Sequence, residues 1–75
     1  MTSAFVAIHC EMGKEAQVIR KLKETKEILE VTGVLGLYDI IIKVEARDST
    51  TLEQIVTKHV RKIPHVLTTM TLIVI

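Results

Sequence analysis

The sequence is poor in the residues that build disulfides and base-stacking surfaces. Its 75 residues include one cysteine, one tyrosine, one phenylalanine and no tryptophan. A single thiol cannot form an internal disulfide, and it fits a reducing, cytoplasmic setting better than a secreted one. With aromatic residues at 3%, the chain offers almost no platform on which nucleic-acid bases could stack. We therefore expect a cytoplasmic protein with an aliphatic core.

An excess of charge of one sign is also missing. Lys and Arg alternate with Asp and Glu along the chain, and the formal net charge is +1. Without a basic stripe to neutralise phosphates, we expect no direct binding to nucleic acid. No apolar run approaches the length of a membrane span, and no signal-peptide pattern opens the chain, so we expect no membrane partner.

What the chain has in abundance is hydrophobic residues, at 48% of the total. Seventy-five residues make one domain, and a monomer of this size buries a low fraction of its surface. Small domains are therefore usually stabilised by cross-links such as disulfides or by association with other subunits. Because an internal disulfide is excluded, association is the expected route.

Hydrophobic periodicity predicts six elements in the order βαββαβ. The expected elements are a strand at Ala4–Cys10, a helix at Lys14–Thr25, strands at Ile28–Thr32 and Ile40–Ala46, a helix between Asp48 and Pro64, and a strand at Val66–Ile75. This order predicts an α+β fold, the ferredoxin-like plait, with a four-stranded antiparallel sheet, strand order 4-1-3-2 and both helices on one face.

The two predicted helices have recognisable apolar faces. In the first, Ala16, Ile19 and Leu22 fall on one face, with Val18 flanking. In the second, Thr50 and Glu53 have the spacing of a capping box. His59 lies within the apolar stripe of that helix, so we expect a partly buried structural histidine.

Both faces of the predicted sheet are largely apolar. In the first strand, one face carries Ala4, Val6, Ile8 and Cys10, and the other carries Phe5 and Ala7. In the last strand, we assign Val66, Met70, Leu72 and Val74 to one face, and Leu67, Ile73 and Ile75 to the other, beside Thr69 and Thr71. Two helices can cover only one face, so a second copy of the sheet is the simplest cover for the other.

The segment between the second and third strands carries the clearest functional pattern. Gly33, Gly36, Tyr38 and Asp39 crowd into a loop that leads directly into a β-forming run. Glycines allow a ligand to approach backbone N–H groups, which would receive a carboxylate, and Asp39 would receive an ammonium group. We expect a pocket for a small zwitterion here, with an ordinary hairpin turn as the alternative.

Several short segments together form a recognisable pattern. They are Thr32-Gly33, Gly36-Leu37-Tyr38-Asp39-Ile40, Lys43-Val44-Glu45-Ala46, Ile63-Pro64-x-Val66 and Thr69-x-Thr71. Residues 1–75 as a whole resemble the effector-binding domain of the Lrp/AsnC family of amino-acid-responsive transcription regulators, in its stand-alone form without a helix-turn-helix domain. His65 departs from the family, whose members often have glycine there.

The resemblance implies a dimer in which two sheets pack face to face as an α+β barrel, with dimers assembling further. An amino-acid effector would bind at a subunit interface, and a full-length Lrp/AsnC regulator is a candidate partner through which transcription or metabolism is modulated. The ligand-binding residues implied are Gly36, Leu37, Tyr38, Asp39, Thr69 and Thr71.

The remaining reactive residues raise three other possibilities, which are a metal site, a hydrolase and a small barrel enzyme. His9, Cys10 and Glu11 are neighbours in a strand and point to alternate faces, so they cannot close on one metal, and we expect no metal or cofactor. An acylphosphatase-like hydrolase would need an asparagine amide, which the chain lacks. A small dimeric α+β-barrel enzyme, similar to a cofactorless monooxygenase or isomerase, stays open as the alternative to a non-enzymatic sensor, with His9 in its pocket.

Overall fold

Strand β1 (Thr2–Cys10) lies in the middle of the sheet because it pairs antiparallel with both β3 (Ile40–Ala46) and β4 (Val66–Ile73). Strand β2 (Ile28–Gly33) pairs with the free side of β3, so the order is β2-β3-β1-β4. The computed structural model describes all 75 residues. The predicted plait topology and strand order are confirmed.

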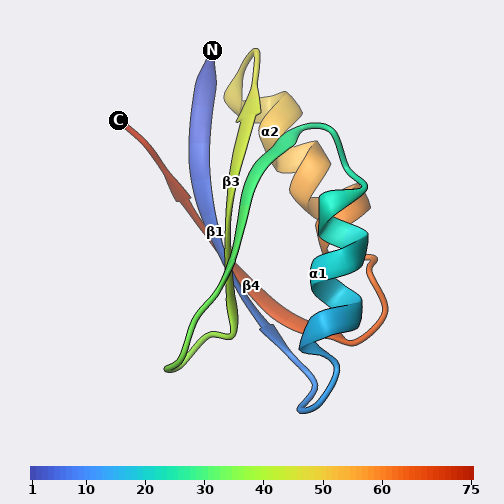
Figure 1. Cartoon of the computed structure of the whole chain (residues 1–75). Coiled ribbons are helices and arrows are strands. Elements are labelled where there is room, and N and C mark those ends of the chain that lie inside the picture. The colour runs from blue at the N-terminus through green and yellow to red at the C-terminus, as the bar shows by residue number, and fades with distance from the viewer.

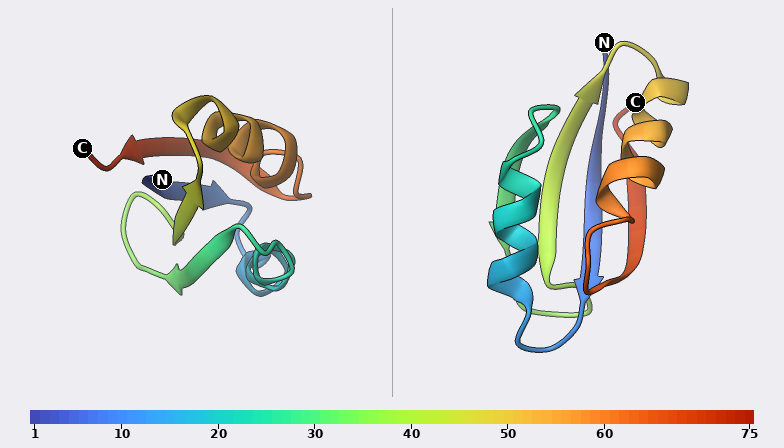
Figure 2. Two further views of the ribbon diagram at one scale, coloured as in Figure 1. Left: turned by 90° about the horizontal axis from the view of Figure 1, so that it is seen from above. Right: turned by 90° about the vertical axis from the view of Figure 1, so that its right-hand side faces the viewer.

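The helices lie on one side of this sheet (Figure 1). Helix α1 (Glu15–Lys23) follows β1, and helix α2 (Ser49–Ile55) follows β3 and continues into a π-helical turn, η1 (Val56–Val60). In Figure 2, α1 lies beside β2, whereas α2 and η1 lie beside β4. None of these helices is long and apolar enough to cross a membrane.

The core between sheet and helices is entirely aliphatic apart from the Cys10 thiol. Alternate residues of the two central strands have no exposed surface, among them Val6, Ile8, Ile40 and Ile42. The helices contribute Val18, Leu22, Leu52, Ile55, Val56 and Val60. No polar or charged residue is buried, so the free energy of folding comes from one apolar layer without desolvated charges.

Helix α1 packs through a different stripe from the predicted one. Val18 and Leu22 are completely buried, Ile19 is half-buried, and Ala16 is exposed. Val18 and Leu22 stand one helical turn apart, so their side chains face the sheet together. The prediction that Ala16 belongs to the buried face is wrong, because the two larger side chains set the rotation of the helix.

Helix α2 begins one residue after Asp48, whose carboxylate accepts a hydrogen bond from Thr51 N–H at 2.7 Å. Asp48 is therefore the N-cap, and the predicted Thr50–Glu53 capping box is wrong. At the other end, the wider π turn of η1 keeps Val56 and Val60 buried. It leaves His59 exposed, which corrects the prediction of a partly buried histidine.

A bulge decides which side chains of β4 face the helices. The register between β1 and β4 shifts between His9 and Cys10, so that Cys10 pairs with Val66. Val66 therefore packs against the core, and the predicted grouping of Val66 with Met70 is wrong. Beyond the bulge the prediction holds, since Thr69 and Thr71 stand opposite Ile8 and Val6 on the helix-facing side.

The uncovered face of the sheet is most apolar over β1 and β4. Phe5, Met70 and Leu72 are 41%, 47% and 54% exposed. Their neighbours on β3 include Lys43, whose ammonium group lies 5.9 Å from the centre of the Phe5 ring. The expectation of an apolar second face is thus met on half of the sheet.

The turn before β4 explains the departure at His65. This residue has φ +77°, in the left-handed region that favours glycine. Two contacts hold it there, because the His65 carbonyl accepts a hydrogen bond from Glu11 N–H at 2.9 Å and the His65 ring bonds the Glu11 carboxylate. The loop after β1 thereby fixes the start of β4.

We expect truncation of the core to destabilise the fold strongly. Leu52 has no exposed surface, so Leu52→Ala should reduce the free energy of unfolding by about 2–5 kcal/mol. The control is Met12→Ala, at a side chain that is 95% exposed, which should change it by less than about 0.5 kcal/mol. Urea denaturation measures both, and similar losses would contradict the assignment of the core.

Candidate functional site

The loop between β2 and β3 lies at the end of the sheet opposite the two chain termini (Figure 1). It is closed by a hydrogen bond from Val34 N–H to the Asp39 carbonyl at 2.8 Å, and Asp39 N–H donates to the Ile8 carbonyl at 2.9 Å. Between these anchors, the N–H groups of residues 35–38 make no backbone hydrogen bond. They are available to a ligand.

Gly36 is the point at which this loop needs a glycine. Its φ is +146°, and a Cβ added there would meet no atom within 4 Å. Backbone conformation, not crowding, therefore restricts this position. The flanking Leu35 and Leu37 point into solvent, at 103% and 90% exposure. The two leucines thus present apolar surface on both sides of the glycine.

Asp39 is held by the end of β1. Its Oδ2 atom accepts a hydrogen bond from Cys10 N–H at 2.9 Å and lies 2.9 Å from His9 Nδ1. The hydrogen bond from the Cys10 backbone, followed by that of His9, lowers the pKa of Asp39 below its ordinary 3.8. Asp39 is therefore an ionised carboxylate with Oδ1 still free of hydrogen bonds.

The pairing of Asp39 with His9 is the feature that sequence reasoning missed. The two residues are 30 positions apart, and only the antiparallel register of β1 and β3, in which Ile8 stands opposite Ile40, brings them together. The enzymatic alternative places His9 in the catalytic pocket of a barrel enzyme. In the structure its ring instead supports the carboxylate of the loop.

A hollow of about 590 Å³ lies between this loop and α1. It is lined by Glu15 and Ile19 of α1 and by Gly33, Val34, Leu35 and Asp39. Its volume is within the range of small-molecule sites. Asp39 is the predicted residue that reaches this hollow, whereas Glu15 and Ile19 were not predicted, since only the packing of α1 against β2 places them there.

Tyr38 and the threonine pair lie on opposite faces of the sheet. The Tyr38 hydroxyl donates to the Met70 sulfur at 3.8 Å, on the uncovered face. Thr69 and Thr71 line a separate hollow of about 280 Å³ beneath α2 and η1. Within one chain, Asp39 lines the hollow beside α1, whereas Gly36, Leu37 and Tyr38 stand in the same loop without lining it, and both threonines lie apart from the loop.

The cysteine and the acidic residues form no metal centre in this arrangement, since no three His, Cys, Asp or Glu side chains come together. Cys10 is buried in the core. Burial, and next the charge of Asp39, raises the pKa of its thiol, which keeps it protonated and unreactive at neutral pH.

The chain is similar over nearly its whole length to one protein family and to several solved structures. The family described as the Lrp/AsnC ligand binding domain matches residues 3–75. The crystal structure of FFRP-DM1 is 39% identical with a TM-score of 0.95 and covers 100% of both chains. AsnC of E. coli is 27% identical with a TM-score of 0.93, over 99% of this chain and 50% of AsnC.

Two other similarities are partial or distant. The transcriptional regulator NMB0573 of Neisseria meningitidis, solved as a complex with L-Met, is 16% identical with a TM-score of 0.86, over 99% of this chain and 49% of the regulator. That similarity shows the fold alone. A homocitrate synthase of Sulfolobus acidocaldarius is 33% identical over 73 residues. The chain spans 15% of the length of that enzyme.

The lowered pKa of Asp39 predicts acid sensitivity. The unfolded chain binds the Asp39 proton more tightly than the folded chain does, so stability is present above the ordinary pKa of 3.8 and is lost as the pH falls through the lower folded value. Urea denaturation at about pH 6 and about pH 3 measures how much the free energy of unfolding falls in acid. This fall should be smaller in Asp39→Asn than in the unchanged protein.

The control is Glu30→Gln, because Glu30 is exposed and its side chain makes no hydrogen bond or ion pair. Its acid-induced loss should equal that of the unchanged protein. An equal loss in Asp39→Asn would contradict the role given to the Cys10 and His9 contacts.

Proposed function

The chain belongs to the family of Lrp/AsnC ligand-binding domains, and we propose that it is an amino-acid-sensing module that binds its effector at a subunit interface around the β2–β3 loop. The family and its regulator members point to a non-enzymatic, regulatory role. The enzymatic alternative built on His9 is therefore not retained. The observation that carries the proposal is the ionised Asp39 on the wall of the hollow beside α1.

Asp39 would bind the ammonium group of an amino acid. Its Oδ2 atom already accepts two hydrogen bonds, which fix the side chain, and Oδ1 can accept a charge-assisted hydrogen bond. A carboxylate held in one orientation loses little conformational entropy when a ligand binds. His9 and the Cys10 backbone thereby act as positioning groups.

The backbone of the same loop would bind the carboxylate of the amino acid. The N–H groups of residues 35–38 have no partner, and Gly36 leaves open space where a side chain would stand. An anion can therefore approach the backbone closely. The two charged ends of a zwitterion would then be held from adjacent positions of one loop, with Val34 and Leu35 of the hollow as apolar contacts.

A second subunit would complete the site. Leu35 and Leu37 are exposed beside it, and the uncovered sheet face carries Phe5, Met70 and Leu72. Two such faces packed together would form the α+β barrel of a homodimer, and further contacts at the loop would join dimers. Since Thr69 and Thr71 lie apart from the loop within one chain, they would reach a ligand only from another subunit.

The signal would pass to a partner protein. The chain is similar to half of E. coli AsnC and to 15% of a homocitrate synthase, so both a full-length Lrp/AsnC regulator and a metabolic enzyme are candidate partners. In either case the module would bind the amino acid and change the partner's assembly, without itself contacting DNA. We propose that it acts in the cytoplasm, where a lone thiol stays reduced.

The first test is calorimetric titration with the common amino acids, including L-Met. We expect one or more of them to bind, and Asp39→Ala to weaken that binding by about ten- to a hundredfold, because a charge-assisted hydrogen bond is lost. Asp48→Ala is the matched control, since Asp48 also accepts a backbone N–H but lies at the start of α2. Equal affinity in Asp39→Ala would contradict the proposal.

The second test concerns assembly. Sedimentation velocity at micromolar concentration should show a dimer or larger species in place of the 8.4 kDa monomer. Leu72→Lys would place a charge in the centre of the proposed sheet-to-sheet contact and should shift the protein towards the monomer. Met12→Lys, in the exposed loop after β1, should leave the assembly unchanged. A monomeric unchanged protein would refute the interface.

A further inference from the structure

Positive charge collects on the helical side of the molecule, between α1 and η1. Two hollows adjoin there, of about 280 and 370 Å³, and Lys21 and Pro64 border both. The smaller is also lined by Arg20 and His65. The larger also includes Lys58, His59 and Lys62, which belong to η1 and to the turn that follows it.

These cations are hardly neutralised by the protein itself. The hollows are lined by four Lys or Arg residues and by one carboxylate, Glu24, whereas the whole chain has a net charge of only +1. Lys21 and Glu24 are 3.9 Å apart and mostly exposed, which makes a weak pair. Arg20, Lys58 and Lys62 make no ion pair.

The fold, not the sequence, creates this concentration. In the sequence, Glu15, Glu24 and Glu27 lie among the Lys and Arg residues of α1 and of the turn that follows it, which indicates an ordinary solvated face. Folding brings Arg20 and Lys21 next to Lys58 and Lys62, from an element more than 30 positions later, while Glu15 lies at the Asp39 hollow. The excess of positive charge is thus a property of the tertiary structure.

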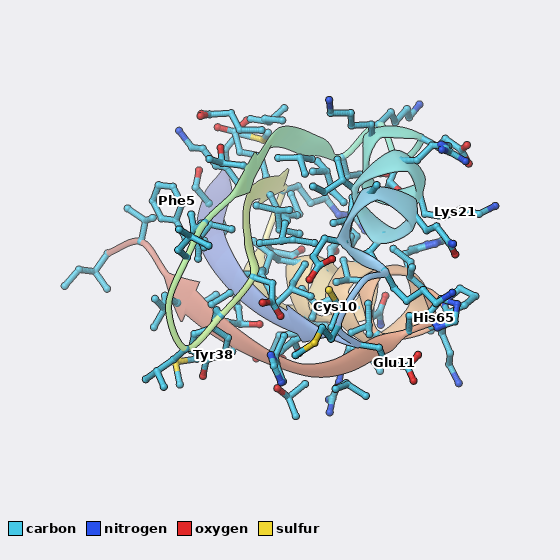
Figure 3. All side chains as sticks on the ribbon, turned by 60° about the horizontal axis from the view of Figure 1, so that its bottom comes forward. Phe5, Cys10, Glu11, Lys21, Tyr38 and His65 are labelled. Carbon is cyan, nitrogen blue, oxygen red and sulfur yellow. The ribbon has the colours of Figure 1, made fainter.

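His65 lies at the edge of this surface. Its Nδ1 atom bonds the Glu11 carboxylate, which fixes the ring and leaves Nε2 without a partner. Figure 3 shows Lys21 and His65 on the same side of the molecule, away from Phe5 and Tyr38. The surface is therefore separate from both the uncovered sheet face and the β2–β3 loop.

We propose that these two hollows bind the phosphate groups of a small polyanion that contains a diphosphate or triphosphate chain. Lysine and arginine are the side chains that bind phosphate oxygens in proteins. Two adjoining hollows with cations around both suit a chain of phosphates better than a single compact anion. No phenylalanine, tyrosine or tryptophan lines them, so the proposal is confined to the phosphate chain of the ligand.

This inference does not depend on the amino-acid site. Asp39 and the residues of the β2–β3 loop line neither basic hollow. The two ligands could therefore be bound at the same time, and the failure of one proposal would leave the other untouched.

The experiment is calorimetric titration of the unchanged protein with inorganic tripolyphosphate at low salt, with citrate as a polyanion that has no phosphate. We expect tripolyphosphate to bind and citrate to bind at least about tenfold more weakly. Lys21→Gln/Lys62→Gln should weaken tripolyphosphate binding by about tenfold or more. The matched control is Lys23→Gln/Lys26→Gln, which removes the same charge from exposed positions that line neither hollow.

Three results would overturn the proposal. The first is the absence of tripolyphosphate binding at millimolar concentration. The second is an equal effect of the two double variants or equal binding of citrate, since either would mean general charge attraction. The third is tighter binding of a short DNA duplex than of tripolyphosphate at the same lysines, which would make the surface a nucleic-acid contact.

Discussion

The structure depends on one constraint, which is that two short helices can cover only one face of a four-stranded sheet. The covered face is packed so completely that alternate residues of β1 and β3 have no exposed surface. The other face keeps Phe5, Met70 and Leu72 partly in water. A fold of this size cannot bury both faces by itself, and the remaining apolar area favours association with a like surface.

The same constraint leaves the charged and hydrogen-bonding side chains at the surface of the protein. The interior holds no polar or charged side chain, so the charged side chains lie on loops, helix surfaces, the uncovered sheet face or strand ends. At one end of the sheet, three consecutive residues of β1 and its following loop hold two other segments of the chain. His9 and Cys10 hold Asp39 of the β2–β3 loop, and Glu11 holds His65 before β4. The β2–β3 loop and the turn before β4 are thereby fixed to β1, a central strand of the sheet.

Two candidate sites of opposite charge result from this arrangement. The hollow beside the β2–β3 loop contains the ionised carboxylate of Asp39, which suits an ammonium group. The paired hollows between α1 and η1 contain cations, which suit phosphates. Helix α1 lines both, with Glu15 and Ile19 at one and Arg20 and Lys21 at the other. A change in the position of this single helix would therefore alter both sites.

The sequence alone determined the order of the elements, the plait topology and the loop of the candidate site. These follow from local physics, because alternation, helical spacing and glycine positions act within a few residues of one another. Only the tertiary structure decided the rotation of α1, the π turn that exposes His59, the bulge that turns Val66 inward, and the contact between His9 and Asp39. Each depends on residues far apart in the chain, and their pairing is set by how the layers pack rather than by any nearby pattern.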